Sequence, residues 1–125
     1  MKKWNLWGGM LFFIVFLATG GWLVSNVSAS GDDYLHMAGR ANHIYLLLIA
    51  LLNIVFGVAD FRHQPSRLLS SSRLVLLVSG VIAAIGFFTE TDCSLNDRML
   101  MPTAVGLAFL GVVLLLLNEC KSKKQ

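Results

Sequence analysis

Residues 41–59 read ANHIYLLLIALLNIVFGVA and contain no charged side chain. About 20 apolar residues in a helix span the hydrocarbon core of a bilayer, and a helix satisfies its own backbone polar groups there. Residues 41–59 therefore predict a membrane-spanning helix. The chain contains three further charge-free runs, namely residues 4–31, 74–89 and 99–118.

The overall composition agrees with this interpretation. The chain has 125 residues, of which 56% are hydrophobic and 14% are charged, whereas roughly a quarter of the residues of a soluble domain are charged. The run 74–89 is short for a span, but it gains length if residues 68–72 join the helix and Arg73 extends its charge to the interface. We predict an all-α, single-domain protein (1–125) with almost no extramembrane domain and helices at about 5–25, 38–60, 68–89 and 98–118.

The first span has features of a signal peptide. Lys2 and Lys3 precede an apolar stretch, and Val27-Ser28-Ala29 provides a small-residue motif typical of cleavage sites. The apolar region 6–24, however, is longer than the usual hydrophobic region of a signal peptide. We therefore expect a retained helix rather than a cleaved leader.

The distribution of basic residues predicts the orientation. The connections between spans are short, which favours an up-down-up-down integral membrane bundle. If the N-terminus is cytoplasmic, eight of the ten Lys and Arg residues lie inside, and only Arg40 and Arg98 lie outside. The positive-inside rule then predicts cytoplasmic N- and C-termini (N-in/C-in) in a bacterial-type inner membrane. The basic residues are scattered over short segments, which indicates contact with lipid head groups and no nucleic-acid partner.

Small residues indicate where helices pack closely. We expect helix–helix contacts at Gly80, Ala83, Gly106 and Ala108, because small side chains let membrane helices approach each other. For the last helix, the sequence offers Asn96-Asp97 as N-terminal capping residues.

Two lines of polar residues follow the second span. Asn42, Asn53 and Asp60 lie within about 20° of one another on a helix, and we expect them to make polar contacts with neighbouring helices. The alternative is that they line a polar passage. His36, Arg40 and His43 form the second line, at the outer interface. These three either extend toward water or bind a metal, a haem or an anionic ligand.

The spacing of the two histidines limits the metal hypothesis. His36 and His43 are seven residues apart, about 10.5 Å along a helix axis, which is too far for both rings to bind one ion. Other ligands would have to complete the site, and the predicted outer face offers four sulfur-containing residues: Met37, Cys93, Met99 and Met101. Imidazole with soft sulfur is the ligand set that copper(I) prefers. Cys120 is predicted on the opposite side of the membrane, so it cannot form an intrachain disulfide with Cys93.

The sequence contains no phosphate-binding loop, nucleophile elbow, HExxH or CxxC motif. It predicts a non-enzymatic accessory or assembly subunit of a membrane complex, with the bilayer and either other membrane subunits or further copies of itself as partners. Two alternatives remain open: a copper- or haem-binding redox protein with its site at the outer face, and a small homo-oligomeric transporter or channel.

Overall fold

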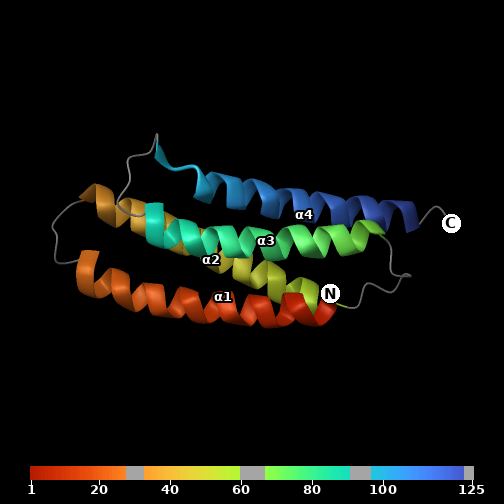
Figure 1. Cartoon of the computed structure of the whole chain (residues 1–125), viewed down its shortest axis with the longest axis horizontal. Helices are drawn as coiled ribbons and strands as arrows, with labels where there is room; N and C mark the ends of the chain where they lie inside the picture. The colour runs from red at the N-terminus through yellow and green to blue at the C-terminus, as the bar shows by residue number, and fades with distance from the viewer. Residues whose placement is uncertain (28–32, 60–66, 91–96, 123–125) are drawn as a thin grey trace.

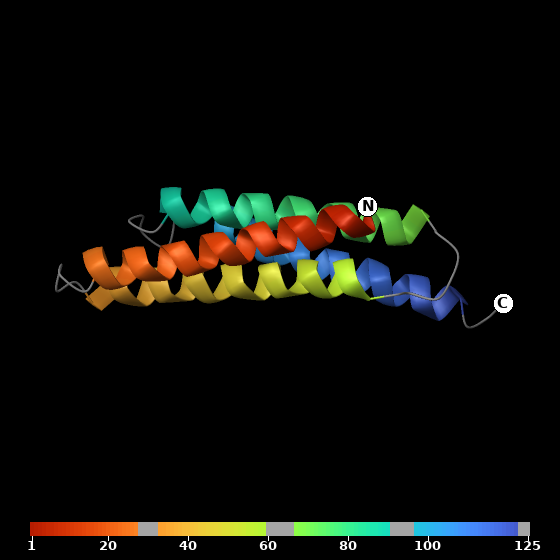
Figure 2. The same cartoon turned by 90° about the horizontal axis from the view of Figure 1, so that it is seen from below.

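The computed structural model describes residues 1–27, 33–59, 67–90 and 97–122. Nearly all of these residues are helical. Helix α1 comprises Lys2–Trp22 and continues into a short π-helix, η1, at Leu23–Val27; α2 comprises Asp33–Val58, α3 Arg67–Glu90 and α4 Leu100–Ser122. Figures 1 and 2 show the four long helices running lengthwise beside one another.

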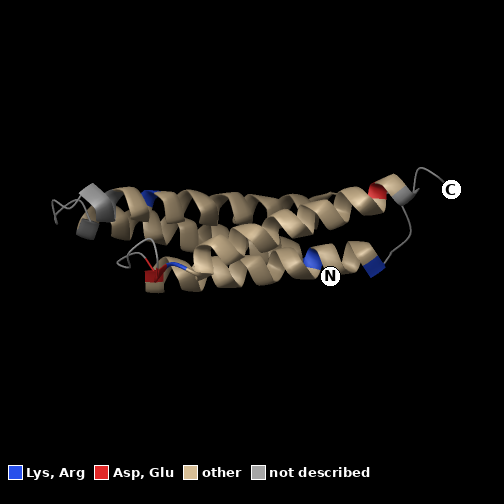
Figure 3. Cartoon of the chain, turned by 90° about the horizontal axis from the view of Figure 1, so that it is seen from above, with Lys and Arg blue, Asp and Glu red and all other residues tan. Residues whose placement is uncertain are grey.

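All four helices are long and apolar enough to cross a membrane, as the charge-free runs predict. The chain therefore has the character of a multi-pass membrane protein. Figure 3 shows the described Lys, Arg, Asp and Glu residues toward the two ends of the helices, with long uncharged stretches between them. Large apolar side chains cover the outside, for example Trp4 and Phe109, each 71% exposed. Such a surface suits contact with lipid rather than with water.

The helices pack most extensively as the pairs α1–α2 and α3–α4. Helices α2 and α3 join the two pairs, α1 also touches α3, and α2 touches α4 least of these pairs. The largest fully buried apolar side chains are those of Phe87, Leu46, Ile49 and Leu76. The largest core side chains therefore lie on α2 and α3, where the two pairs meet, and α4 contributes further residues to the same core.

Glycines bring α1 and α2 into backbone contact. A Cβ atom added at Gly9 of α1 would lie 2.7 Å from the Ile54 nitrogen of α2, and one added at Gly57 of α2 would lie 2.6 Å from the Leu6 Cα of α1. Both distances are far below ordinary van der Waals contact, which begins near 3.4 Å. These two helices therefore approach more closely than any side chain at either position would allow.

Three of the four expected small-residue contacts are present. Gly80 lies against the ring of Phe12, where no Cβ would fit, and Ala83 and Ala108 are buried. The expectation for Gly106 is wrong, because this residue is exposed and a Cβ there would meet nothing within 4 Å. The reason is that Gly106 opens onto the side of the bundle where α2 and α4 scarcely touch.

The start of α4 is capped from the preceding helix. The Glu90 carboxylate, only 5% exposed, accepts hydrogen bonds from the backbone N–H groups of Met99 (2.7 Å), Leu100 and Met101 (2.9 Å). These are N-terminal donors for which a helix has no internal partner, and negative charge is favourable there. The sequence predicted Asn96 and Asp97 as the capping residues, and Asn96 lies outside the described residues. The capping group that the structure describes is Glu90, the last residue of α3.

Candidate functional site

The His43 ring lies between α2 and α1. It stacks on Phe16 with ring centroids 4.0 Å apart, and Phe87 of α3 approaches it edge-on at 6.4 Å. A Cβ added at Gly20 would lie 3.1 Å from the His43 Cε1 atom. The ring is therefore packed into a helix–helix contact, for which the absence of a side chain at Gly20 provides the room.

Hydrogen bonding assigns the two ring nitrogens of His43. Thr19 Oγ1 donates to the Phe16 carbonyl oxygen at 2.9 Å and lies 3.2 Å from His43 Nδ1. A hydroxyl has a single hydrogen, so in the neutral ring Nδ1 donates to Thr19. The other nitrogen, Nε2, then has the lone pair, and it lies next to Gly20. A metal ligand at His43 would be this Nε2 atom.

The described members of the predicted metal set differ widely in exposure. Met37 and Met99 are 71% and 73% exposed, whereas Met101 is 2% exposed and lines a pocket between α2 and α4. Cys93 and the side chain of His36 lie outside the described part of the chain. Within that part, no three His, Cys, Asp or Glu side chains gather in a way that could hold a metal ion. Arg40 is exposed on α2.

Asn53 lies at the junction of three helices and is fully buried. Its Nδ2 donates to the Leu76 carbonyl oxygen of α3 and to Ile49 O of its own helix, both at 3.0 Å. Its Oδ1 accepts from Asn5 Nδ2 at 3.0 Å, and the same Asn5 nitrogen donates to Arg73 O at 2.8 Å. This network ties α1, α2 and α3 together through side-chain amides. Asp60, predicted to belong to the same line, lies outside the described residues.

Asn42 differs from Asn53 in having an unpaired donor. Its side chain is 2% exposed, yet its Nδ2 atom is buried with no hydrogen-bond partner. Leaving a buried donor unpaired costs about 1–3 kcal/mol, so such a group calls for an explanation.

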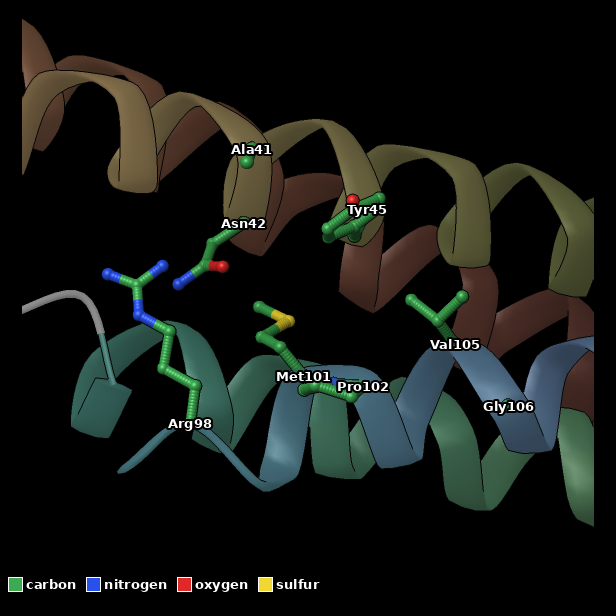
Figure 4. Close-up of a pocket in the computed structure, with 8 residues that line it drawn as sticks. All are labelled: Ala41, Asn42, Tyr45, Arg98, Met101, Pro102, Val105 and Gly106. Atoms are coloured by element: carbon green, nitrogen blue, oxygen red, sulfur yellow. The ribbon is translucent and has the colours of Figure 1, made fainter. Parts of the chain in front are cut away.

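The Asn42 amide faces a pocket of about 510 Å³ between α2 and α4. Figure 4 shows Asn42 and Arg98 extending toward each other from the two sides of this pocket. The remaining wall consists of Ala41, Tyr45, Met101, Pro102, Val105 and Gly106. Arg98 also lies close enough to Glu90 to attract its carboxylate electrostatically. The pocket thus combines two N–H donor groups, one of them cationic, with a largely apolar wall.

Sequence reasoning missed Asn5, the Glu90 cap and the role of Arg98 in the pocket. Asn5 is a lone amide in an apolar run, the same signal that drew attention to Asn42 and Asn53, so it could have been found. Asn42 and Arg98 line the same pocket because of how α4 lies beside α2, and no local sequence pattern reports that arrangement. Comparisons of the chain with protein-family models, with curated proteins and with solved structures found no match.

Proposed function

We propose that the chain is a non-enzymatic accessory or assembly subunit of a membrane protein complex. The observation that carries this proposal is the use of its polar side chains. Asn5 and Asn53 link three helices, Ser72 donates to Gly111 O of α4 at 2.6 Å, and His43 packs against α1. These groups hold the helices together instead of forming a continuous polar path or a catalytic constellation.

The outer surface supports the same proposal. Helix α1 has few buried positions, namely Asn5, Gly9, Phe12 and Thr19, and its outward face exposes Trp7, Leu11 and Ile14 by 67%, 58% and 60%. Broad apolar faces of this kind provide lateral contact area for other membrane helices as well as for lipid.

The topology that accompanies this proposal is an up-down-up-down bundle with both termini in the cytoplasm of a bacterial-type cell. Short connections between consecutive spans favour antiparallel neighbours. The excess of Lys and Arg on the side of the termini favours the N-in/C-in orientation in the inner membrane.

Purification in a mild detergent tests the proposed function. Native mass spectrometry should detect the 13.7 kDa chain within a larger assembly of fixed stoichiometry, containing either other subunits or further copies. Cells that lack the chain should contain less of the assembled complex. A lone monomer in every mild detergent would contradict the proposal, and so would copper or haem bound to the purified monomer at one equivalent per chain.

A further inference from the structure

The pocket between α2 and α4 contains the buried donor that the fold leaves unpaired. Asn42 is 2% exposed and its Nδ2 has no partner, although the protein pairs the comparable amides of Asn5 and Asn53. A hydrogen-bond acceptor in the pocket would satisfy this donor. Because the amide lies in the pocket wall, the missing acceptor belongs to something that enters the pocket.

Charge identifies the class of acceptor. Arg98 extends toward Asn42 from the α4 side (Figure 4), and a guanidinium binds phosphate oxygens with particular strength because its N–H groups form a planar fork. Glu90 attracts Arg98 electrostatically, and its carboxylate also accepts three backbone N–H groups at the start of α4. An anionic oxygen group therefore suits the polar end of the pocket better than a neutral or cationic one.

The rest of the pocket has the character of a binding site for a hydrocarbon chain. Pro102, Val105 and Gly106 continue the wall along α4, and Tyr45 continues it along α2. Gly106 is exposed and a Cβ there would meet nothing within 4 Å, so the groove beside it is open. The volume of about 510 Å³ falls within the range of small-molecule sites.

The position along the helices fits a lipid. The apolar span of α2 begins at Met37. Asn42 lies five residues further along, which corresponds to about 8 Å of helix. The apolar span of α4 begins at Leu100. Gly106 lies six residues further along, or about 9 Å. The polar groups thus lie toward the ends of the two spans, and the open groove runs from them toward the membrane centre.

We propose that this pocket binds an anionic phospholipid from the bilayer. The lipid phosphate accepts hydrogen bonds from Asn42 Nδ2 and from the Arg98 guanidinium, and an acyl chain lies along Val105 and Gly106. This site does not depend on the accessory role, since lipid binding and assembly with other subunits are measured separately.

Native mass spectrometry of the full chain tests the site, after exchange into micelles containing equal amounts of phosphatidylglycerol and phosphatidylcholine. The wild-type protein should retain phosphatidylglycerol preferentially. Asn42→Leu and Arg98→Gln should each weaken its binding by about tenfold, the change expected from losing one hydrogen bond to an ionised group. Arg98→Lys should retain part of the preference.

Gly106→Leu provides a variant that blocks the groove without disturbing the core, because a Cβ there meets no neighbour. Gly21→Leu is its matched control, since a Cβ at Gly21 of α1 also meets nothing within 4 Å. Gly106→Leu should abolish retention of phosphatidylglycerol, and Gly21→Leu should leave it unchanged. Melting temperatures of all variants establish that each is folded.

Four results would overturn the proposal. The first is equal retention of the two lipids by the wild-type protein, and the second is undiminished retention by Gly106→Leu. The third is displacement of the bound species by inorganic phosphate at equal concentration, which would assign the pocket to a soluble anion. The fourth is dissociation of a dimer by Gly106→Leu with no change in lipid, which would assign the groove to a second copy of the chain.

Discussion

Gly57→Ala should destabilise the bundle, although alanine is the better helix former. The new methyl group would lie 2.5 Å from the Leu6 nitrogen and 2.6 Å from its Cα, so a backbone rather than a flexible side chain would have to move. Restoring ordinary contact at 3.4 Å or more requires α1 and α2 to separate by nearly 1 Å. Overpacking typically costs about 1–3 kcal/mol, and alanine recovers roughly 0.5–1 kcal/mol of helix propensity. At the middle of both ranges, the net loss in the free energy of unfolding is roughly 1 kcal/mol.

Reversible unfolding in mixed detergent micelles, followed by circular dichroism, measures this loss. Gly106→Ala is the matched control, because it is the same substitution in a helix with nothing within 4 Å of the new atom. It should be neutral or stabilising by up to about 1 kcal/mol. If Gly57→Ala were as stable as Gly106→Ala, the backbone contact between α1 and α2 would not constrain the fold and the reasoning would fail.

Three other predictions concern hydrogen bonds and topology. A double-mutant cycle with Asn5→Leu and Asn53→Leu should give a coupling energy in the unfolding assay between about 0.6 kcal/mol, the average for polar pairs within membranes, and about 1.7 kcal/mol, the largest such value; additive effects would argue against the bond. Glu90→Gln should destabilise the bundle by about 1 kcal/mol and accelerate amide exchange in the first turn of α4, through loss of a charged cap; unchanged exchange would refute the cap. A membrane-impermeant thiol reagent applied to intact cells should label Cys93 and spare Cys120; the reverse pattern would invert the topology.

The four helices were predictable because the membrane imposes a simple rule. Charge-free runs of sufficient length indicate spans whatever their side chains pack against. Helix boundaries were harder to predict. Helix α2 begins at Asp33 rather than near residue 38, because hydropathy marks only the apolar span, and polar residues before that span can be helical too. The packing of Gly80 and Ala83 was also predictable, because small residues mark close approach. Gly106 shows the limit of that rule, since a small residue equally marks an open groove.

The candidate site was only partly predictable. Asn42 and Asn53 are equivalent in sequence, two amides on one side of one helix, yet the structure pairs one and leaves the Nδ2 of the other without a partner. The difference comes from their neighbours, α1 and α3 beside Asn53 and the pocket beside Asn42. His43 and Arg40 stand out in the sequence as ionisable residues near the start of a long apolar run, but what surrounds the His43 ring depends on the tertiary contact with α1.

The pairing of helices has a consequence for how the chain is assembled. Helices α1 and α2 form one extensive contact and α3 and α4 another, while the junction between the pairs includes the Asn5 and Asn53 hydrogen bonds to backbone oxygens of α3. We therefore predict that each pair enters the bilayer as one unit before the two pairs meet. Two separately expressed fragments, divided between α2 and α3, should recombine in the membrane, and the amides should specify their alignment.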